Sequence, residues 1–429
     1  MMNFSDRIYA PGSKSRTGSG KENYSMTYSN KGVCAAKGFR ASGIHCGVRK
    51  NKTKKDLCLI VSDVKCSAAA VYTTNLVKGA PITVTKKNIS DGVAQAIIVN
   101  SGNANTCNAD GIEVAERMCA LVEEYTLIPS DDVVVASTGV IGQPLSIVPI
   151  ENGMRELVDS LGYDNSDDAN EAIMTTDTTK KSVAVTFELG GKECAIGGIA
   201  KGSGMIHPNL ATMLVFITTD VAISSDMLKK ALLDDVSDTF NMVSIDGDTS
   251  TNDTLCILAN GLAGNREIVC EGEDFDKFKA ALHALTDRMC RMIAADGEGA
   301  DRMIEVKVSG AYDKENARKI AKSIVCSSLT KAAIFGADAN WGRVLCAIGY
   351  SGAVVDINRV GVDFVSDKGE IAVCRNGAGI PFSEEKAKEI LLEKNITINV
   401  TLGDGNGCAT AYGCDLTYEY VRINGDYRT

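Results

Sequence analysis

The chain has 429 residues, and its 45 Lys and Arg residues against 55 Asp and Glu residues give a formal net charge of −10. This length suits two or three domains of roughly 100–200 residues each, and a composition with 45% hydrophobic and 23% charged residues excludes wholesale disorder. The negative charge argues against a general nucleic-acid binder, because such a protein needs a basic surface.

The first 30 residues are rich in Ser, Gly, Asn and Lys and lack apolar periodicity, which predicts a flexible leader over residues 1–30. The GSGK run within it is not a phosphate-binding loop, because Glu22 replaces the required Ser or Thr and no strand precedes it. The Ser content resembles that of a mitochondrial transit peptide, but Asp6 and Glu22 disfavour that interpretation.

From residue 31 onward the chain is continuously patterned. Apolar runs typical of β-strands occur at residues 58–61, 96–99, 133–136, 182–189, 213–217, 303–308 and 396–402. Helical spacing predicts helices at residues 113–124, 225–233, 275–295 and 383–393, the last with Ser383 as its N-cap. Strands and helices interleave without a regular βαβ period, which predicts an α/β (α+β layered) fold rather than a Rossmann sheet or a (β/α)8 barrel.

Of the 41 glycines, 15 lie in seven polar segments near the ends of apolar runs. These segments cover residues 101–111, 137–143, 200–209, 246–253, 295–301, 336–342 and 403–413. Any one of them is explained by a tight turn, but seven segments rich in Asn, Asp and Thr favour a shared small-molecule pocket.

The 15 cysteines are spread singly, their number is odd and no CxxC pair exists, so we expect reduced thiols packed as small hydrophobic residues. The three histidines, His45, His207 and His283, lie far apart in sequence, which predicts no metal site and disfavours a Ser-His-Asp mechanism. No apolar run reaches the roughly 18–20 residues that span a bilayer, and no signal peptide is recognisable. We therefore expect a soluble, cytoplasmic protein without a membrane partner.

The middle of the chain carries the most specific pattern. A glycine-bearing loop passes through Ala211 and Thr212 directly into an apolar strand, and Thr212 divides the chain nearly in half. The segment KGSGMIHPNLATML resembles the self-cleavage and nucleophile segment of the glutamate N-acetyltransferase (ornithine acetyltransferase) family. Further motifs recur in family order over residues 31–429: NSGNANTCNADG, STGVIGQPL, MTTDT, DGDTSTNDT, DGEGAD, FGADANWGRVL, GCDLTYEYV and INGDYRT.

The resemblance implies stacked mixed sheets flanked by helices, in the αββα arrangement of N-terminal-nucleophile enzymes. It also implies autocatalytic cleavage between Ala211 and Thr212, giving an alpha chain of residues 31–211 and a beta chain of residues 212–429. Thr212 is then both nucleophile and base, because an α-amino group with a pKa of about 7.7–8.0 can accept the hydroxyl proton without a histidine. The oxyanion hole is implied at Thr138 and Gly139.

The implied reaction is ping-pong acetyl transfer from N2-acetyl-L-ornithine to L-glutamate in arginine biosynthesis, with no metal or other cofactor. The implied substrate-binding positions are Thr175, Lys201, Thr212, Glu298, Asn424 and Thr429. Lys201 suits a substrate carboxylate and Glu298 suits the ornithine ammonium, whereas Thr175 cannot be separated from Thr176 by sequence. His207 is expected to pack or hydrogen bond beside the cleavage loop, and Asp301 stands where the family more usually has Thr, which leaves a ligand role there in doubt.

The family forms dimers of cleaved pairs, which implies a heterotetramer of two alpha and two beta chains. The residues leave open whether acetyl-coenzyme A also serves as donor. The alternative function is a related self-cleaving N-terminal-nucleophile aminopeptidase, which would use water as acceptor instead of glutamate. A small-metabolite binding protein is a third possibility, and it would have no reason to cut its own chain.

Overall fold

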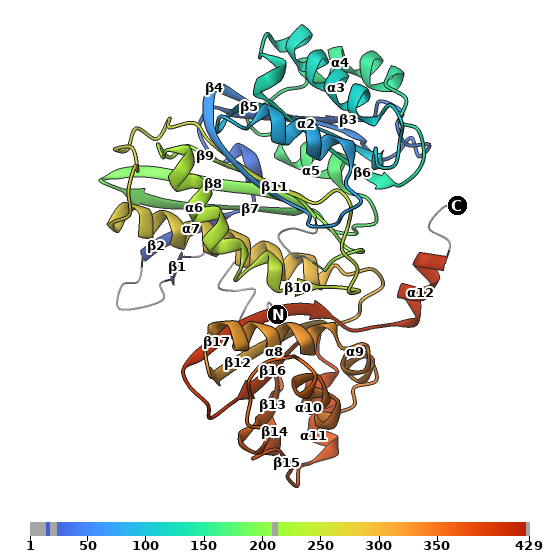
Figure 1. The fold of residues 1–429 in the computed structure, drawn as a ribbon, viewed down its shortest axis with the longest axis vertical. Coiled ribbons are helices and arrows are strands. Elements are labelled where there is room, and N and C mark those ends of the chain that lie inside the picture. Colours follow the sequence, from blue (N-terminus) through green and yellow to red (C-terminus); the bar gives the residue numbers. More distant parts are fainter. Residues whose placement is uncertain (1–13, 18–23, 208–212, 426–429) are drawn as a thin grey trace.

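The structure is a computed structural model that describes residues 14–17, 24–207 and 213–425 (Figure 1). In this part of the chain, ten strands form a first sheet in the order β1-β2-β7-β8-β9-β11-β4-β5-β6, with β3 paired to β4. Its strands are β1 (Lys14–Thr17), β2 (Tyr24–Ser29), β3 (Phe39–Ile44), β4 (Leu57–Tyr72), β5 (Val93–Asn103), β6 (Val133–Val140), β7 (Lys181–Leu189), β8 (Lys192–Lys201), β9 (Leu214–Thr219) and β11 (Thr254–Ala259).

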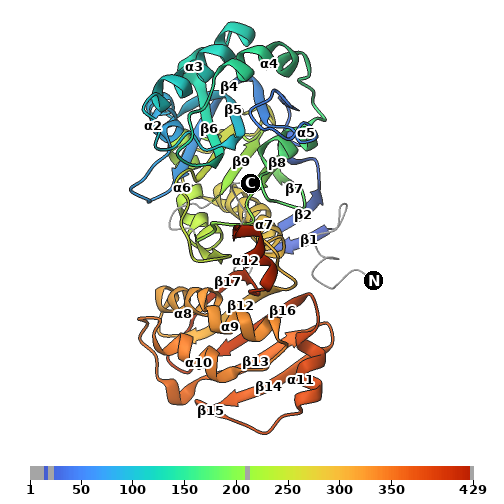
Figure 2. The same cartoon turned by 90° about the vertical axis from the view of Figure 1, so that its right-hand side faces the viewer.

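The long strand β4 bends this sheet into two layers. Its register with β5 shifts between Val61 and Cys66, so its first part pairs with β3 and β5 while its last part pairs with β11. Helices cover the outer faces: α2 (Ala80–Asn88), α3 (Gly111–Thr126) and α4 (Val148–Asp159) on one layer, and α6 (Ser225–Val236) and α7 (Glu273–Ala295) on the other (Figures 1 and 2). Helix α5 (Ser166–Ile173) contacts strands of both layers on the inner face. The predicted α/β class with stacked sheets between helices is confirmed.

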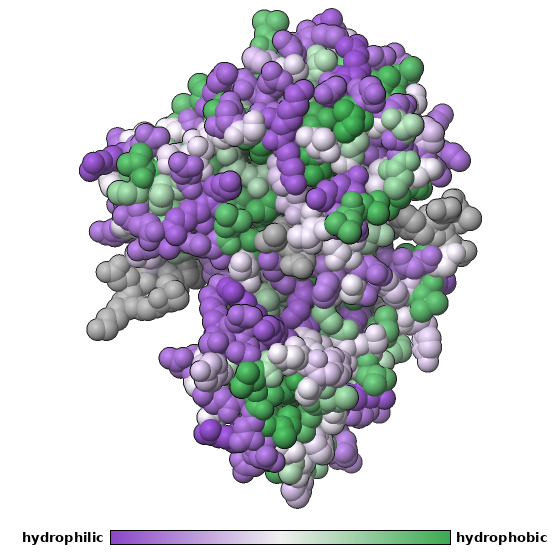
Figure 3. All heavy atoms as spheres, viewed as in Figure 1, coloured by the Kyte–Doolittle hydropathy of each residue, from purple (hydrophilic) through white to green (hydrophobic). Residues whose placement is uncertain are grey.

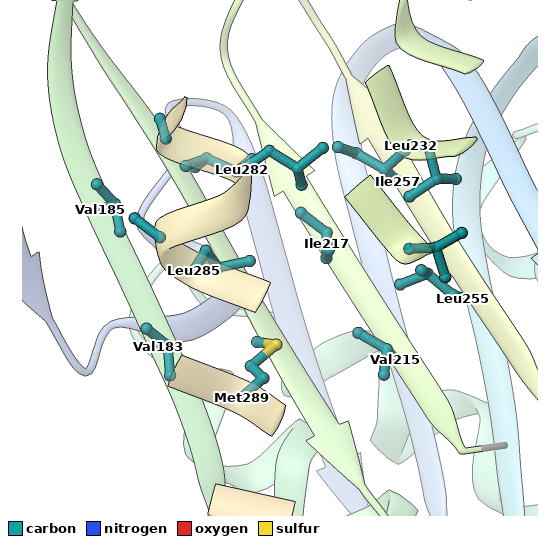
Figure 4. Close-up of a cluster of buried hydrophobic side chains, with 14 of the residues drawn as sticks. Val183, Val185, Val215, Ile217, Leu232, Leu255, Ile257, Leu282, Leu285 and Met289 are labelled. Carbon is teal, nitrogen blue, oxygen red and sulfur yellow. The ribbon is translucent and has the colours of Figure 1, made fainter. Parts of the chain in front are cut away.

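Alternation along the strands explains this layering. In β9, Leu214 and Phe216 point to the inner core, whereas Val215 and Ile217 point to the outer core under α6 and α7. Figure 4 shows Val215 and Ile217 beside leucines of both helices, including Leu282. Fully burying such a side chain stabilises the fold by about 1.5–3 kcal/mol. A strand with apolar side chains on both faces is therefore expected between two helix-covered layers.

A second, mixed sheet forms the other end of the molecule. In the described residues it has seven strands in the order β10-β17-β12-β16-β13-β14-β15. They are β10 (Val243–Ser244), β12 (Met303–Ala311), β13 (Gly361–Ser366), β14 (Gly369–Arg375), β15 (Ala378–Gly379), β16 (Asn395–Thr401) and β17 (Gly407–Cys414). Its helices are α8 (Lys314–Cys326), α9 (Ser328–Phe335), α10 (Trp341–Gly349) and α11 (Glu384–Leu391). Helix α7 also contacts β17, and the C-terminal helix α12 (Tyr418–Gly425) lies apart from this sheet (Figure 1).

The elements predicted from sequence lie where they were expected. Each of the seven apolar runs overlaps a strand, and each of the four helical stretches overlaps a helix, with bounds that extend at most two residues beyond the element. The Ser383 hydroxyl accepts a hydrogen bond from the Lys386 N–H, which confirms its role as N-cap. The leader prediction does not hold for residues 14–17 and 24–29, because they form β1 and β2. These strands pair with each other, and β2 pairs with β7, with Met26 and Tyr28 buried.

The cysteines, the surface and the helix lengths can also be compared with the expectations from sequence. All 15 cysteines are free thiols, and many are buried among apolar side chains, as expected for reduced thiols. Polar residues dominate the face seen in Figure 3, where apolar patches are separate from one another. Within the described ranges, no helix combines the length and apolar character needed to cross a bilayer.

Candidate active site

The predicted cleavage segment joins two neighbouring strands of the first sheet. Strand β8 ends at Lys201 and strand β9 begins at Leu214, and these two residues are partners in the antiparallel register. Ala211, Thr212 and Thr429 lie outside the described residues. Lys201 therefore stands beside the strand that starts two residues after Thr212.

A small pocket opens at this point. It brings together the end of β6, the end of β8, the start of β9 and the segment that precedes β11. Its lining residues are Thr138, Lys201, Gly204, Met205, Ile206, Met213, Leu214, Ser250, Asn252 and Asp253. The predicted oxyanion residue Thr138 and the predicted ligand Lys201 thus share one pocket with the residue that follows Thr212.

The backbone at Thr138 and Gly139 is held in an unusual conformation. Gly139 has φ +133°, and a Cβ there would lie 2.3 Å from the carbonyl carbon of Gly102 on β5. Only glycine fits this position, because the conformation is strained for other residues and the obstacle is backbone. The Asn252 amide donates a hydrogen bond of 2.9 Å to the carbonyl oxygen of Ser137, which fixes the strand end beside the pocket.

Glu298 forms a second polar centre near the pocket. Its side chain is 8% exposed, and it accepts hydrogen bonds from the Thr176 hydroxyl (2.6 Å) and the Asn424 amide (2.8 Å). A Cβ on Gly204, which lines the pocket, would lie 2.3 Å from the Glu298 carboxyl carbon. The structure therefore places the predicted residues Glu298 and Asn424 in contact, at the edge of the pocket formed by Gly204.

The threonine that reaches this centre is Thr176. Its hydroxyl contacts both Glu298 and Ser203, whereas Thr175 contributes its backbone N–H to the Asp177 carboxylate. The sequence motif could not distinguish the two threonines, and contact with Glu298 distinguishes them by geometry.

A buried network of charges fixes the loop that carries Thr176. The Lys181 ammonium, which is fully buried, pairs with Asp177 and with Asp296. Burial opposes ionisation of Asp177, but the ammonium groups of Lys181 and Lys201 lower its pKa to about 2. The Gly202 N–H also donates to Asp177, so the same carboxylate holds the backbone next to Lys201.

Lys201 and Asp253 lie in the pocket with opposite shifts of their pKa values. Burial lowers the pKa of Lys201, although Asp177, Asp253 and Glu298 oppose this change. Burial raises the pKa of Asp253 well above its usual range, against the effect of Ser250, Lys201 and Thr73. Both shifts favour the uncharged forms. Asp253 was not singled out from sequence, although its place directly before the apolar run of β11 is a usable signal.

The two positions where the sequence departs from the family pattern lie outside the pocket lining. The His207 ring lies 3.2 Å from the Ser244 hydroxyl and 3.4 Å from the Cys326 sulfur, and burial lowers its pKa to about 4. Asp301 is exposed, and its backbone N–H donates to the Asp415 carboxylate.

Comparison with known proteins places the chain in a family. The model of the ArgJ family matches residues 40–429. The chain is 47% identical over 401 residues to "Arginine biosynthesis bifunctional protein ArgJ 1" of Clostridium acetobutylicum, covering 93% of this chain and 98% of the relative. It is 49% identical over 398 residues to "Arginine biosynthesis bifunctional protein ArgJ" of Thermotoga neapolitana, covering 92% and 99% of the two chains.

Solved structures of similar sequence also match. The crystal structure of arginine biosynthesis bifunctional protein argJ from Bacillus halodurans is 44% identical, with a TM-score of 0.47, and covers 49% of this chain and 97% of that one. Ornithine acetyltransferase from Mycobacterium tuberculosis, solved in complex with ornithine, is 33% identical, with a TM-score of 0.40, and covers 43% and 100%. By its match over residues 40–429 and its identity to curated relatives along nearly their whole length, this chain belongs to the ArgJ family.

Proposed function

We propose that this protein transfers the acetyl group of N2-acetyl-L-ornithine to L-glutamate, through an acetyl-Thr212 intermediate formed after self-cleavage at Ala211–Thr212. Membership of the ArgJ family makes the chain an acetyltransferase of arginine biosynthesis. The observation that carries the finer proposal is the pocket that joins Thr138, Lys201 and Met213, the residue directly after Thr212.

The chemistry begins with the Thr212 hydroxyl. Its oxygen attacks the acetyl carbonyl of N2-acetyl-L-ornithine, and the free α-amino group of Thr212 takes the hydroxyl proton. Thr138 and the Gly139 N–H stabilise the oxyanion of the tetrahedral intermediate, an effect worth about 100–1,000-fold in rate for one donor. The α-ammonium group gives this proton to the nitrogen of the departing ornithine. The amine of glutamate then attacks the acetyl ester, its proton passes through the α-amino group to the Thr212 oxygen, and N-acetyl-L-glutamate is released.

Two charged centres match the charges of the substrates. Glu298 suits the side-chain ammonium of ornithine, because its carboxylate is oriented by two hydrogen bonds and lies at the pocket edge. Lys201 suits the α-carboxylate that both substrates carry, because an incoming carboxylate favours its charged form. Thr176, Asn424 and Thr429 complete the proposed binding set, with Thr176 in place of Thr175 because the Thr176 hydroxyl contacts Glu298.

The proposed two-chain product is expected to stay together. Strand β8, before the cut, pairs with β9, after it, over six residue pairs from Ile196↔Thr219 to Lys201↔Leu214. The Lys181–Asp296 ion pair also joins the two sides. We therefore propose an alpha chain and a beta chain that remain associated, in a heterotetramer of two of each, which size-exclusion chromatography at high salt tests.

The test combines cleavage and turnover. Thr212→Ala is expected to leave an intact polypeptide by mass spectrometry and to abolish exchange between N2-acetyl-L-ornithine and glutamate, whereas Thr212→Ser retains part of both activities because the hydroxyl survives. Thr126→Ala, at the remote C-terminal end of α3, is the control and is expected to behave as the native protein.

The same assay separates the alternative functions. Running it with acetyl-coenzyme A as donor tells whether the enzyme has a second acetyl source, and release of free acetate or amino acids without glutamate would indicate a hydrolase. A Thr212→Ala protein that still splits into two similar pieces contradicts the assignment of the nucleophile.

A further inference from the structure

Self-cleavage poses a chemical problem that turnover does not. Before the cut, the Thr212 nitrogen is part of the Ala211–Thr212 peptide bond, so it cannot act as a base. A different group must take the hydroxyl proton, and a proton must reach the departing nitrogen. The three histidines do not line the pocket. The first cleavage therefore needs another acid and base at the same place.

The pocket holds two titratable side chains, and both are buried. Lys201 is 8% exposed and Asp253 is 2% exposed. The Thr254 N–H, next to Asp253, donates to the carbonyl oxygen of Met213, so the parallel β9–β11 register holds Asp253 alongside the residue that follows Thr212. Lys201 approaches from the opposite neighbour, β8, through its pairing with Leu214.

Asp253 also has unused hydrogen-bonding capacity. Its Oδ2 atom is buried and has no hydrogen-bond partner among the described residues. A buried carboxyl oxygen without a partner costs free energy, roughly 1–3 kcal/mol, and such a group calls for a functional explanation. Its location in the pocket lining supplies one, since a reacting group there can complete the missing bond.

We infer that Lys201 and Asp253 are the base and the acid of chain cleavage, an inference that rests on the proposed function. The Lys201 amine takes the proton of the Thr212 hydroxyl while the Thr212 hydroxyl oxygen bonds to the Ala211 carbonyl carbon. The carbon–nitrogen bond then breaks, and Asp253 gives its proton to the Thr212 nitrogen. The result is an ester, a free α-amine and a Lys201–Asp253 ion pair. Water then hydrolyses the ester, leaving the Ala211 carboxylate and restoring the Thr212 hydroxyl.

The electrostatics of the pocket agree with these roles. Burial moves the pKa of Lys201 down and that of Asp253 up, which provides an amine able to accept a proton and an acid able to donate one. The charged groups that face Lys201 are Asp177, Asp253, Lys181 and Glu298. The charged group that faces Asp253 is Lys201, and the uncharged hydroxyls of Ser250 and Thr73 face it as well.

The experiment follows cleavage of the newly made full chain. The protein is synthesised in a cell-free system with labelled methionine, and the intact and cut forms are separated by gel electrophoresis over time at pH 5 to 10. The native chain is expected to show a bell-shaped rate profile, because cleavage needs Lys201 without its proton and Asp253 with its own. Asp253→Asn is expected to slow cleavage at least about 100-fold and to remove the falling limb.

The control is Asp220→Asn. Asp220 is another buried acid whose pKa is raised by burial, and it follows the last residue of β9, about 20 Å from Leu214 along the strand. This variant is expected to cleave within threefold of the native rate. A merely structural effect of Asp253→Asn would lower the rate without changing the shape of the profile, and that outcome overturns the inference.

Three other results of the cleavage experiment also decide between the inference and its alternatives. If Asp253→Asn does not fold, the native profile still decides, because a rate that climbs steadily to pH 10 contradicts an acid–base pair of this kind. Cleavage of Asp253→Asn at the native rate overturns the inference alone. A native chain that is never cut at Ala211–Thr212 instead overturns the proposed function, so the two failures are distinguishable.

Discussion

Lys181 is the point at which the charge network is most sensitive to substitution. Its fully buried ammonium neutralises Asp177 and Asp296, and the two contacts are 2.7 and 2.5 Å long. Lys181→Met keeps the length of the side chain but leaves two buried carboxylates without their partner. Removing one member of a buried ion pair typically costs about 3–5 kcal/mol. At about 2–4 °C per kcal/mol, the expected fall in melting temperature is roughly 6–20 °C.

Differential scanning calorimetry on the purified protein measures this change. The matched control is Lys319→Met, which removes the exposed pair between Lys319 and Glu315 on α8 and is expected to leave the melting temperature almost unchanged, because solvent screens such a pair. Lys181→Met with Asp296→Asn is expected to recover part of the loss, because one of the stranded charges is gone. A melting temperature for Lys181→Met within 2 °C of the native value would refute the reasoning.

Three further expectations follow from the site. Gly139→Ala is expected to lower turnover by about 100-fold or more, because the new Cβ meets the Gly102 backbone at 2.3 Å and displaces the proposed oxyanion donor. Gly349→Ala, at the end of α10, has open space around the new Cβ and no left-handed backbone, and it is expected to change turnover less than threefold. Glu298→Gln is expected to raise KM for N2-acetyl-L-ornithine at least tenfold while KM for glutamate changes less than threefold; equal changes in both would contradict a role in holding the ornithine ammonium. The pKa of Asp177 is about 2 in the folded protein against an ordinary value of 3.8, so its ionisation adds about 2 kcal/mol to the free energy of unfolding. This stabilisation is present above about pH 4 and is lost as the pH falls through 2. Urea unfolding between pH 5 and 2 measures the loss, and Asp177→Asn should flatten this pH dependence.

The strands that sequence predicts well are those made of unbroken apolar runs. Residues 96–99 and 213–217 read as strands because both of their faces are covered by other layers, so every position is apolar. Strand β8 gave no such signal, since Gly197 and Gly198 interrupt its pattern. The structure explains the interruption: a Cβ on Gly197 would lie 1.9 Å from the Gly32 carbonyl oxygen. Close backbone approach therefore removed the side chains on which strand prediction depends.

The segment at residues 403–413 shows the same effect more strongly. Its glycines read as a polar loop near a ligand, yet residues 407–414 form β17, which pairs with β12 in the second sheet. A Cβ on Gly407 would lie 2.1 Å from the carbonyl oxygen of Asp313, so this glycine serves packing. Glycine content alone could not separate a turn from a tightly packed strand.

Some of the site residues could be found from sequence motifs, and one could not. Motif order brought Thr138, Lys201, Glu298 and Asn424 to attention, and the structure brings the first two into one pocket and the last two into contact. Asp253 was missed because three aspartates occur in DGDTSTNDT, and sequence does not tell which one is buried. Burial is a property of the three-dimensional packing, and here it is what gives one carboxyl its distinct chemistry.

The position of the proposed cut explains how one bond can break without loss of the fold. The loop between β8 and β9 links strands that already pair in the sheet, so cutting it removes a covalent tie but none of the backbone hydrogen bonds between them. The outer core mixes residues from both sides of the cut, such as Val183 and Val185 with Leu282 and Leu285 (Figure 4). Separating the two chains would expose this core to water, at about 25 cal/mol for each Å² of apolar surface. The proposed cut would therefore place a new amine at the pocket while the layers around it keep the proposed acid, base and oxyanion donors in position.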